Sequence, residues 1–302
     1  MRVAWRCLVL AAASAAPARV AAQSVEKGHP SVSPDGRRIA YVETRGGHGR
    51  LFVIGVDGGN AHELSLPDVD RSPQWSRAGE LVFTGEGADS GKILSASVDG
   101  GAPRVRAMVP GRTQSLSPDG SRVLYLVGPW TSTALVVADT DGAHPRTLAG
   151  GRATAWNGTW SPDGMRVAYT YGDSTRLLQV HVMNSDGTGD RAVTHATAVE
   201  GSAQLPAWSP EGGRLAVQVN DLPRHSSEIW IVDVASGEVR RPAPHAAAYL
   251  DETPSWFPDG TRLAFQSNRS GTMEVWVMDA DGSSPVQLTG RAASPGGRLR
   301  QP

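Results

Sequence analysis

Short apolar runs that follow a tight-turn signal are the most regular feature of this 302-residue chain. In the best-preserved copy, the turn signal Trp256–Gly260 precedes the apolar run Leu263–Phe265. The residue before the turn's proline recurs at Ser33, Ser76, Ser117, Ser161, Ser209 and Phe257, with Arg77 replacing the proline in the second copy. The period is about 41–48 residues, and a period of that length indicates a repeat architecture.

Each repeat contains the pattern of four short strands. The first strand ends at the turn signal, the second is the apolar run, and the third is a run such as Ile229–Val232. A second turn, usually Asp-Gly, precedes a brief fourth strand that ends near Leu64, Val105, Leu148, Val193, Val239 and Leu288. Pro, Asp and Gly supply the backbone angles of tight hairpin turns. We therefore predict an all-β fold, a six-bladed β-propeller of four-stranded antiparallel blades.

Four tryptophans share one position at the end of the first strand: Trp75, Trp160, Trp208 and Trp256. We expect them to pack between neighbouring blades, because burial of an aromatic ring stabilises such an interface. No repeat needs a strand from the other end of the chain, so we expect blade one to close the ring by packing against the face of blade six.

The termini predict three segments. Basic Arg2 and Arg6, an apolar stretch from Cys7 to Ala16 and small residues up to Ala22 form a secretory signal pattern over residues 1–22. We expect the propeller over residues 23–289 and a disordered tail over 290–302. Cys7 is the single cysteine, so cleavage would leave a mature chain without thiol or disulfide chemistry. This pattern predicts a periplasmic or secreted bacterial protein.

The charge pattern narrows the choice of partners. The chain has 29 basic and 30 acidic residues, and the signal removes three of the basic ones. No basic stripe is visible, so we expect no nucleic-acid partner. No later stretch has the length of about 20 apolar residues that a membrane span needs, so we expect no stable membrane insertion after signal cleavage.

The repeats resemble a known family. The segment Trp256–Thr289, with Ser267–Gly271 and Glu274–Gly282, resembles the Pro-Asp (WD40-like) propeller repeats of the TolB family, and the resemblance extends over roughly Gly28–Thr289. TolB is the periplasmic component of the Tol–Pal envelope system, so the resemblance implies an exported scaffold that binds an envelope protein or peptide. TolB has a further N-terminal domain, and here only Gln23–Lys27 precede the first repeat, which counts against a true Tol–Pal role.

Similar repeats occur in enzymes, so two alternatives stay open. The first is a metal-dependent polysaccharide lyase of the oligogalacturonate type, with His29, His62, His144, His195 and His245 as candidate ligands. Their spacing shows no ligand pattern, and we expect no metal and no cofactor. The second is a detached propeller that gates a separate prolyl oligopeptidase-type hydrolase. The chain contains no Gly-x-Ser-x-Gly, His-Glu-x-x-His, Cys-x-x-Cys or phosphate-loop motif, so we expect a protein that is not an enzyme.

The longer connections, after the second and fourth strands, lie on the face opposite the tight turns. Irregular loops on a rigid scaffold commonly carry binding residues. The candidates that we place there are Asp70, Arg71, Arg112, Trp130, Arg152, Trp156, Glu200, Gln204, Asp251 and Glu252. Arginine beside acid near the expected channel mouth suits a peptide, a polar ligand or a cation, although a mutually paired, solvated rim is the alternative. Trp130 and Trp156 fall outside the repeating tryptophan position and are candidates for stacking on a ligand.

Overall fold

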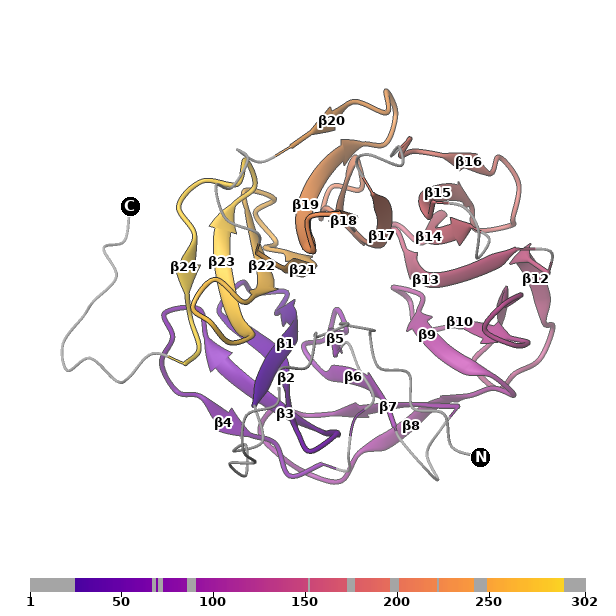
Figure 1. The fold of residues 1–302 in the computed structure, drawn as a ribbon. Coiled ribbons are helices and arrows are strands. Elements are labelled where there is room, and N and C mark those ends of the chain that lie inside the picture. The colour runs from indigo at the N-terminus through magenta and orange to yellow at the C-terminus, as the bar shows by residue number, and fades with distance from the viewer. Residues whose placement is uncertain are drawn as a thin grey trace, which may run out of the picture.

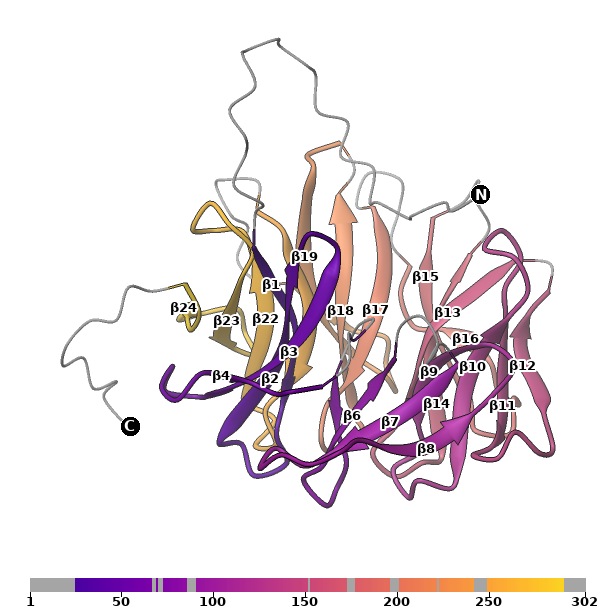
Figure 2. The ribbon, with the colours of Figure 1, turned by 90° about the horizontal axis from the view of Figure 1, so that it is seen from below.

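The computed structural model describes residues 25–66, 69, 73–85, 91–151, 153–172, 177–195, 201–221, 223–241 and 249–290. Within these residues the chain forms six sheets of four strands, and all the strand pairs inside the sheets are antiparallel. The sheets stand as blades around a common axis, which confirms the predicted six-bladed propeller (Figure 1). Seen from the side, the strands run between two faces of the ring (Figure 2).

The first two strands of each blade lie nearest the axis. The first strands, one per blade, are β1 (Glu26–Val32), β5 (Gln74–Trp75), β9 (Arg112–Leu116), β13 (Thr154–Trp160), β17 (Ser202–Trp208) and β21 (Asp251–Trp256). The second strands are β2 (Arg38–Arg45), β6 (Leu81–Thr84), β10 (Arg122–Val127), β14 (Arg166–Gly172), β18 (Arg214–Asp221) and β22 (Arg262–Ser267).

The remaining two strands complete each blade toward the rim. The third strands are β3 (His48–Gly55), β7 (Lys92–Ala96), β11 (Ala134–Asp139), β15 (Gln179–Asn184), β19 (Ser226–Asp233) and β23 (Glu274–Asp279). The fourth strands are β4 (His62–Glu63), β8 (Arg104–Met108), β12 (Arg146–Gly150), β16 (Arg191–Ala192), β20 (Val239–Arg240) and β24 (Val286–Gln287). No helix long and apolar enough to cross a membrane occurs among the described residues.

The Ser-Pro-Asp-Gly turn is held by its own side chains. In blade three, the Ser117 hydroxyl donates to Asp119 Oδ1 at 2.5 Å and accepts the Arg122 N–H at 2.9 Å. The same contacts recur around Ser33 and Ser161. The hydrogen bond from the Ser117 hydroxyl, followed by those from the backbone and hydroxyl of Ser121, lowers the pKa of Asp119 to about 2, because these bonds favour the carboxylate. The aspartates of these turns therefore have a structural role, as the sequence predicted.

The repeating tryptophans pack between blades as expected. Trp256 Nε1 donates to the Ala207 carbonyl of the preceding blade at 3.1 Å, and Arg214 of that blade lies 4.8 Å over the Trp256 ring. The corresponding hydrogen bonds of Trp75 and Trp208 reach Ser31 and Thr159. In each case an arginine that opens a second strand lies over the tryptophan of the following blade, which adds a cation–π contact to the hydrophobic one.

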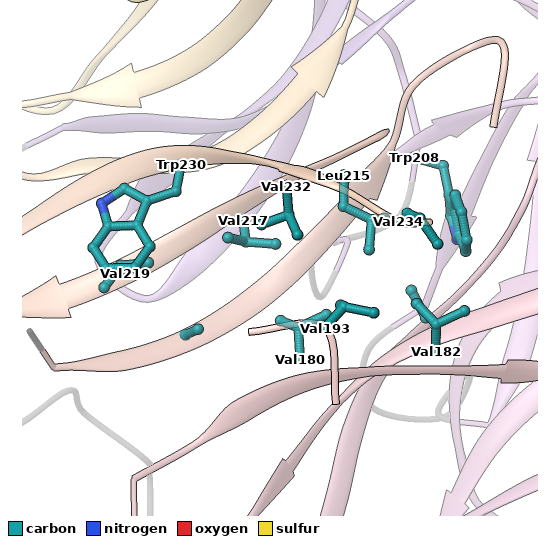
Figure 3. Packing of buried hydrophobic residues seen from close by; sticks show 12 residues of the cluster. Val180, Val182, Val193, Trp208, Leu215, Val217, Val219, Trp230, Val232 and Val234 are labelled. Atoms are coloured by element: carbon teal, nitrogen blue, oxygen red, sulfur yellow. The ribbon is translucent and has the colours of Figure 1, made fainter. Parts of the chain in front are cut away.

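The hydrophobic core is divided among the interfaces between blades. Each of the clusters of buried residues combines side chains from two neighbouring blades. Between blades four and five, for example, Val180 and Val182 face Trp208, Leu215 and their neighbours (Figure 3). A blade has apolar residues on both faces of its sheet, so it can bury them only when a neighbour packs on each side.

Blades one and six close the ring by this same face packing. Ile39 and Tyr41 of blade one share a cluster with Phe257, Ala264 and their neighbours in blade six. Strand order is sequential within every sheet, so no strand is exchanged between the two ends of the chain. The Lys27 ammonium group pairs with the buried Glu274 carboxylate at 3.2 Å, which adds a polar contact to the closure.

Two tryptophans form a matched pair for measuring the inter-blade hydrogen bond. Trp256 and Trp160 are equally buried and are covered by arginine at nearly equal distances, 4.8 and 4.7 Å. Trp256 Nε1 has its carbonyl acceptor, whereas the buried Trp160 Nε1 has no partner among the described residues. We expect Trp256→Phe to lower the free energy of unfolding by about 1 kcal/mol more than Trp160→Phe. Urea denaturation measures both, and equal losses would show that the hydrogen bond contributes nothing.

Candidate functional site

Among the described residues, four inner strands carry a residue in the left-handed backbone region. The residues are His29 (φ 52°), Asn157 (φ 53°), Leu205 (φ 52°) and Thr253 (φ 50°). At each of them the pairing of the first strand with the second shifts register. Non-glycine residues rarely adopt this conformation, which costs about 1–3 kcal/mol each. The inner strands of blades one, four, five and six therefore share a strained bulge.

The backbone N–H of each bulge is held by a side chain of the preceding blade. The donor and acceptor pairs are His29 N to Gln266 Oε1 (2.9 Å), Asn157 N to Gln114 Oε1 (3.0 Å), Leu205 N to Thr170 Oγ1 (3.3 Å) and Thr253 N to Gln218 Oε1 (3.2 Å). These bonds offset part of the strain and join consecutive blades close to the axis. None of these four acceptor side chains was among the predicted residues. For Gln218, Gln266 and Thr170 the signal in the sequence is a polar residue directly after the three apolar positions of the second strand.

Beyond the bulges, four predicted residues occupy one register of the inner strands. Their cross-strand pairs are Arg112 with Leu126, Trp156 with Thr170, Gln204 with Gln218, and Glu252 with Gln266. These partners are equivalent positions of the second strands, so the four residues belong to one layer around the axis. We refer to Arg112, Trp156, Gln204 and Glu252 as the axial ring. All four are partly exposed.

We predicted that the axial ring residues and Asp251 lie in connecting loops, and this prediction was wrong. Arg112, Trp156 and Gln204 lie within β9, β13 and β17, and Asp251 and Glu252 begin β21. Each bulge places one extra residue in the inner strand. Pairing with the second strand therefore resumes upstream of the bulge, in a stretch where polar and apolar residues do not alternate. Of the predicted residues, Trp130 does lie in a connection, the one between β10 and β11.

Glu252 is enclosed by hydrogen-bond donors. Gln266 Nε2 donates to Oε2 at 2.8 Å, while Gln218 Nε2 and the Ser227 hydroxyl donate to Oε1 at 3.3 and 3.4 Å. Burial raises the pKa of the Glu252 carboxyl, the donors oppose this rise, and the charges of Asp251 and Glu26 add to it. No cation pairs with Glu252 among the described residues.

Asp251, next to Glu252, is used differently. It is 2% exposed, and Arg269 Nε donates to its Oδ1 at 3.1 Å while Arg269 Nη2 contacts Oδ2. The Arg269 guanidinium also lies 5.4 Å from the centre of the Phe265 ring. A buried ion pair of this kind is costly to break, since a single charge would then be left buried. Asp251 therefore ties the start of β21 to the connection between β22 and β23 and does not point its charge outward.

Arg112 and Trp130 form the corresponding feature of blade three. The Arg112 guanidinium lies 3.8 Å over the Trp130 ring, and its Nη2 approaches the Gly128 carbonyl at 3.5 Å. Arg112 Nε is buried and has no hydrogen-bond partner in the described structure, and desolvation lowers the pKa of the Arg112 guanidinium. Trp130 remains 46% exposed, although Thr154 Oγ1 holds its backbone carbonyl at 3.2 Å. The pair presents an aromatic surface on a firmly held loop.

The remaining predicted residues divide into packed and undescribed ones. Trp156 packs partly against the cluster between blades three and four, and it keeps some exposed surface. Asp70, Arg71, Arg152, Glu200 and His245 lie outside the described residues, so the structure does not place them. The signal segment 1–22 and all of the predicted tail except Gly290 also fall there.

The described histidines are dispersed. His29 forms a bulge in β1, His62 lies near the Asn60 carbonyl at the rim, and His144 pairs with Asp139 at 2.8 Å. His181 contacts Asp190 at 3.2 Å. Within the part of the chain that the structure describes, no group of three or more His, Cys, Asp or Glu residues is placed to hold a metal ion.

The fold and the axial ring define a six-bladed propeller with an irregular polar layer near one end of its axis. A family model described as the TolB beta propeller domain matches residues 128–296, and one described as the lipoprotein LpqB beta-propeller domain matches residues 9–160. The chain therefore belongs to the TolB β-propeller family.

Solved structures share this fold at low sequence identity. A putative TolB from Agrobacterium tumefaciens is 20% identical, with a TM-score of 0.62 over 88% of this chain and 89% of that one. TolB from Acinetobacter baumannii is 16% identical, with a TM-score of 0.61 over 85% of this chain and 61% of that one. An oligogalacturonate lyase in complex with manganese is 14% identical, with a TM-score of 0.58 over 87% and 78%. The fold is thus shared by proteins with different functions.

Gly28, which occupies the register of the axial ring in blade one, offers a test of the bulge bonds. A Cβ at Gly28 would lie 2.0 Å from Gln266 Oε1, so Gly28→Ala must displace the side chain that holds His29 N. We expect Gly28→Ala to destabilise the wild-type protein by about 1–3 kcal/mol. In a Gln266→Ala background the clash is absent, so the same substitution should cost much less. A double-mutant cycle by urea denaturation measures the difference, and equal costs in both backgrounds would contradict the interpretation.

Proposed function

We propose that this protein is an exported, non-catalytic propeller that binds an envelope protein or peptide through the axial ring and the connections around it. The observation that carries the proposal is the chemical variety of the axial ring. At one register of successive inner strands stand a guanidinium, an indole, an amide and a carboxylate. The turn and inter-blade positions of the repeat, in contrast, carry the same residue types in most blades.

The uniform positions have structural explanations. The turn serine and aspartate close the hairpin, and the tryptophan and arginine join the blades. The axial ring needs no such variety for packing, and it leaves two desolvated charges, at Arg112 and Glu252, without ion-pair partners among the described residues. Charged groups held in this costly state are common at binding sites.

The exposed Trp130 and the predicted signal segment also support the proposal. Arginine and tryptophan are the residue types that most often dominate the energy of protein interfaces, and Trp130 over Arg112 offers both in one contact. The signal pattern of residues 1–22 supports export to the periplasm. No observation on the described residues favours the lyase or the hydrolase-gating alternative over binding.

Affinity capture with matched variants tests the proposal. The tagged full chain would be incubated with envelope extract as wild type, as Arg112→Gln, as Glu252→Gln and as Met165→Gln. Met165 is the control, because it is 66% exposed in a tight turn on the opposite face. We expect the same proteins to be captured by wild type and Met165→Gln, and their amounts to fall about tenfold with either ring variant. Equal capture by all four proteins would contradict the proposal.

A further inference from the structure

The charges of the axial ring have a fixed order around the propeller. Arg112 stands on β9 of blade three and Glu252 on β21 of blade six. Three blade steps separate them in a six-bladed ring, so the two strands face each other across the axis (Figure 1). A cationic and an anionic group thus occupy opposite sides of one layer.

Within the part of the chain that the structure describes, neither of these two charges has a counter-ion. The polar contacts of Glu252 are two glutamine amides and the Ser227 hydroxyl, and the charges that act on it are those of the acids Asp251 and Glu26. Arg112 contacts the Trp130 ring and the Gly128 carbonyl, and no described residue pairs with its buried Nε. A ligand group of opposite charge would recover interaction energy that the protein alone does not supply.

The arc between the two charges is also chemically defined. Trp156 of blade four and Gln204 of blade five lie between Arg112 and Glu252 in the same layer. Blade one contributes no side chain at this register, because Gly28 leaves the space to Gln266. From blade three to blade six the described layer therefore presents, in order, a cation, an aromatic face, an amide and an anion.

We propose that the axial ring binds a dipolar peptide segment, with a carboxylate at Arg112 and an ammonium group at Glu252. The peptide lies along blades four and five, where Trp156 contacts an apolar side chain and the Gln204 amide pairs with a peptide bond. This inference rests on the proposed function and gives its ligand a chemical class and a direction.

The direction distinguishes this proposal from general peptide binding. A segment that is only acidic would satisfy Arg112 and place like charge beside Glu252, and a segment that is only basic would do the reverse. Such mismatches reduce affinity because a charge is brought near another of the same sign in a partly desolvated site. A ligand with both charges, one at each end, satisfies both blades.

Calorimetric titration with capped peptides tests the direction. The probe is the tetrapeptide Ala-Phe-Gly-Ala, used with free ends, N-acetylated, C-amidated, and with both ends capped. For the full mature chain we expect each cap to weaken binding about tenfold, since each removes one charge-assisted contact. In Glu252→Gln, acetylation should have no further effect while amidation still weakens binding. In Arg112→Gln the pattern should be reversed, and Arg112→Lys should restore part of the response to amidation.

The outcomes separate this inference from the proposed function. Equal effects of both caps in wild type and in both variants, or no binding of the free tetrapeptide to wild type, would overturn the inference. If capture of envelope proteins still depends on Arg112 and Glu252 in that case, the proposed function stands alone. If the effect of each cap depends on Arg112 and Glu252 as expected, while neither substitution changes the capture of envelope proteins, the dipolar site stands and the protein-binding role fails. Met165→Gln should match wild type throughout, and circular dichroism at the titration temperature confirms that each variant is folded.

Discussion

The bond between a left-handed inner-strand residue and the preceding blade is the contact on which the centre of this propeller depends. The bulge alone is unfavourable, and it persists because a glutamine or threonine side chain accepts its N–H. The same bulge lets the inner strand pair again upstream, which brings Trp156, Gln204 and Glu252 into one layer. The side-chain oxygens of Gln266 and Gln218 each accept the N–H of a bulge residue, and their side-chain nitrogens donate to Glu252. The same two side chains therefore order both the bulges and the polar layer.

The stability of the outer part has a different origin. Clusters of apolar side chains fill the spaces between neighbouring blades. At the interfaces that have the repeating tryptophan, this residue and the arginine over its ring also join the two blades. Among the described residues, Trp156 is the one member of the axial ring that packs against such a cluster, the one between blades three and four. The other three members, Arg112, Gln204 and Glu252, can therefore vary while the interfaces stay uniform.

The fold was predictable from sequence because the repeated positions carry strong local physics. Pro, Asp and Gly fix the turns, and Leu263–Phe265 and its equivalents can only be buried strands. The site was harder to predict, because no local pattern reveals a bulge at His29 or Thr253. Arg112, Trp156, Gln204 and Glu252 were identified as irregular residues, but their common register emerged only from the strand pairing. The Arg269 partner of Asp251 was missed as well, since it lies 18 residues away in sequence.

We propose that the axial ring serves binding and not folding. The free energy of unfolding of the triple variant Arg112→Gln, Gln204→Ala, Glu252→Gln tests this proposal. Glutamine at 252 keeps a side chain able to hydrogen-bond, and the variant removes two desolvated charges without ion-pair partners in the described structure. We expect the free energy of unfolding of this variant to lie within about 1 kcal/mol of the wild-type value, or above it. A loss of several kcal/mol would show instead that the ring holds the propeller together.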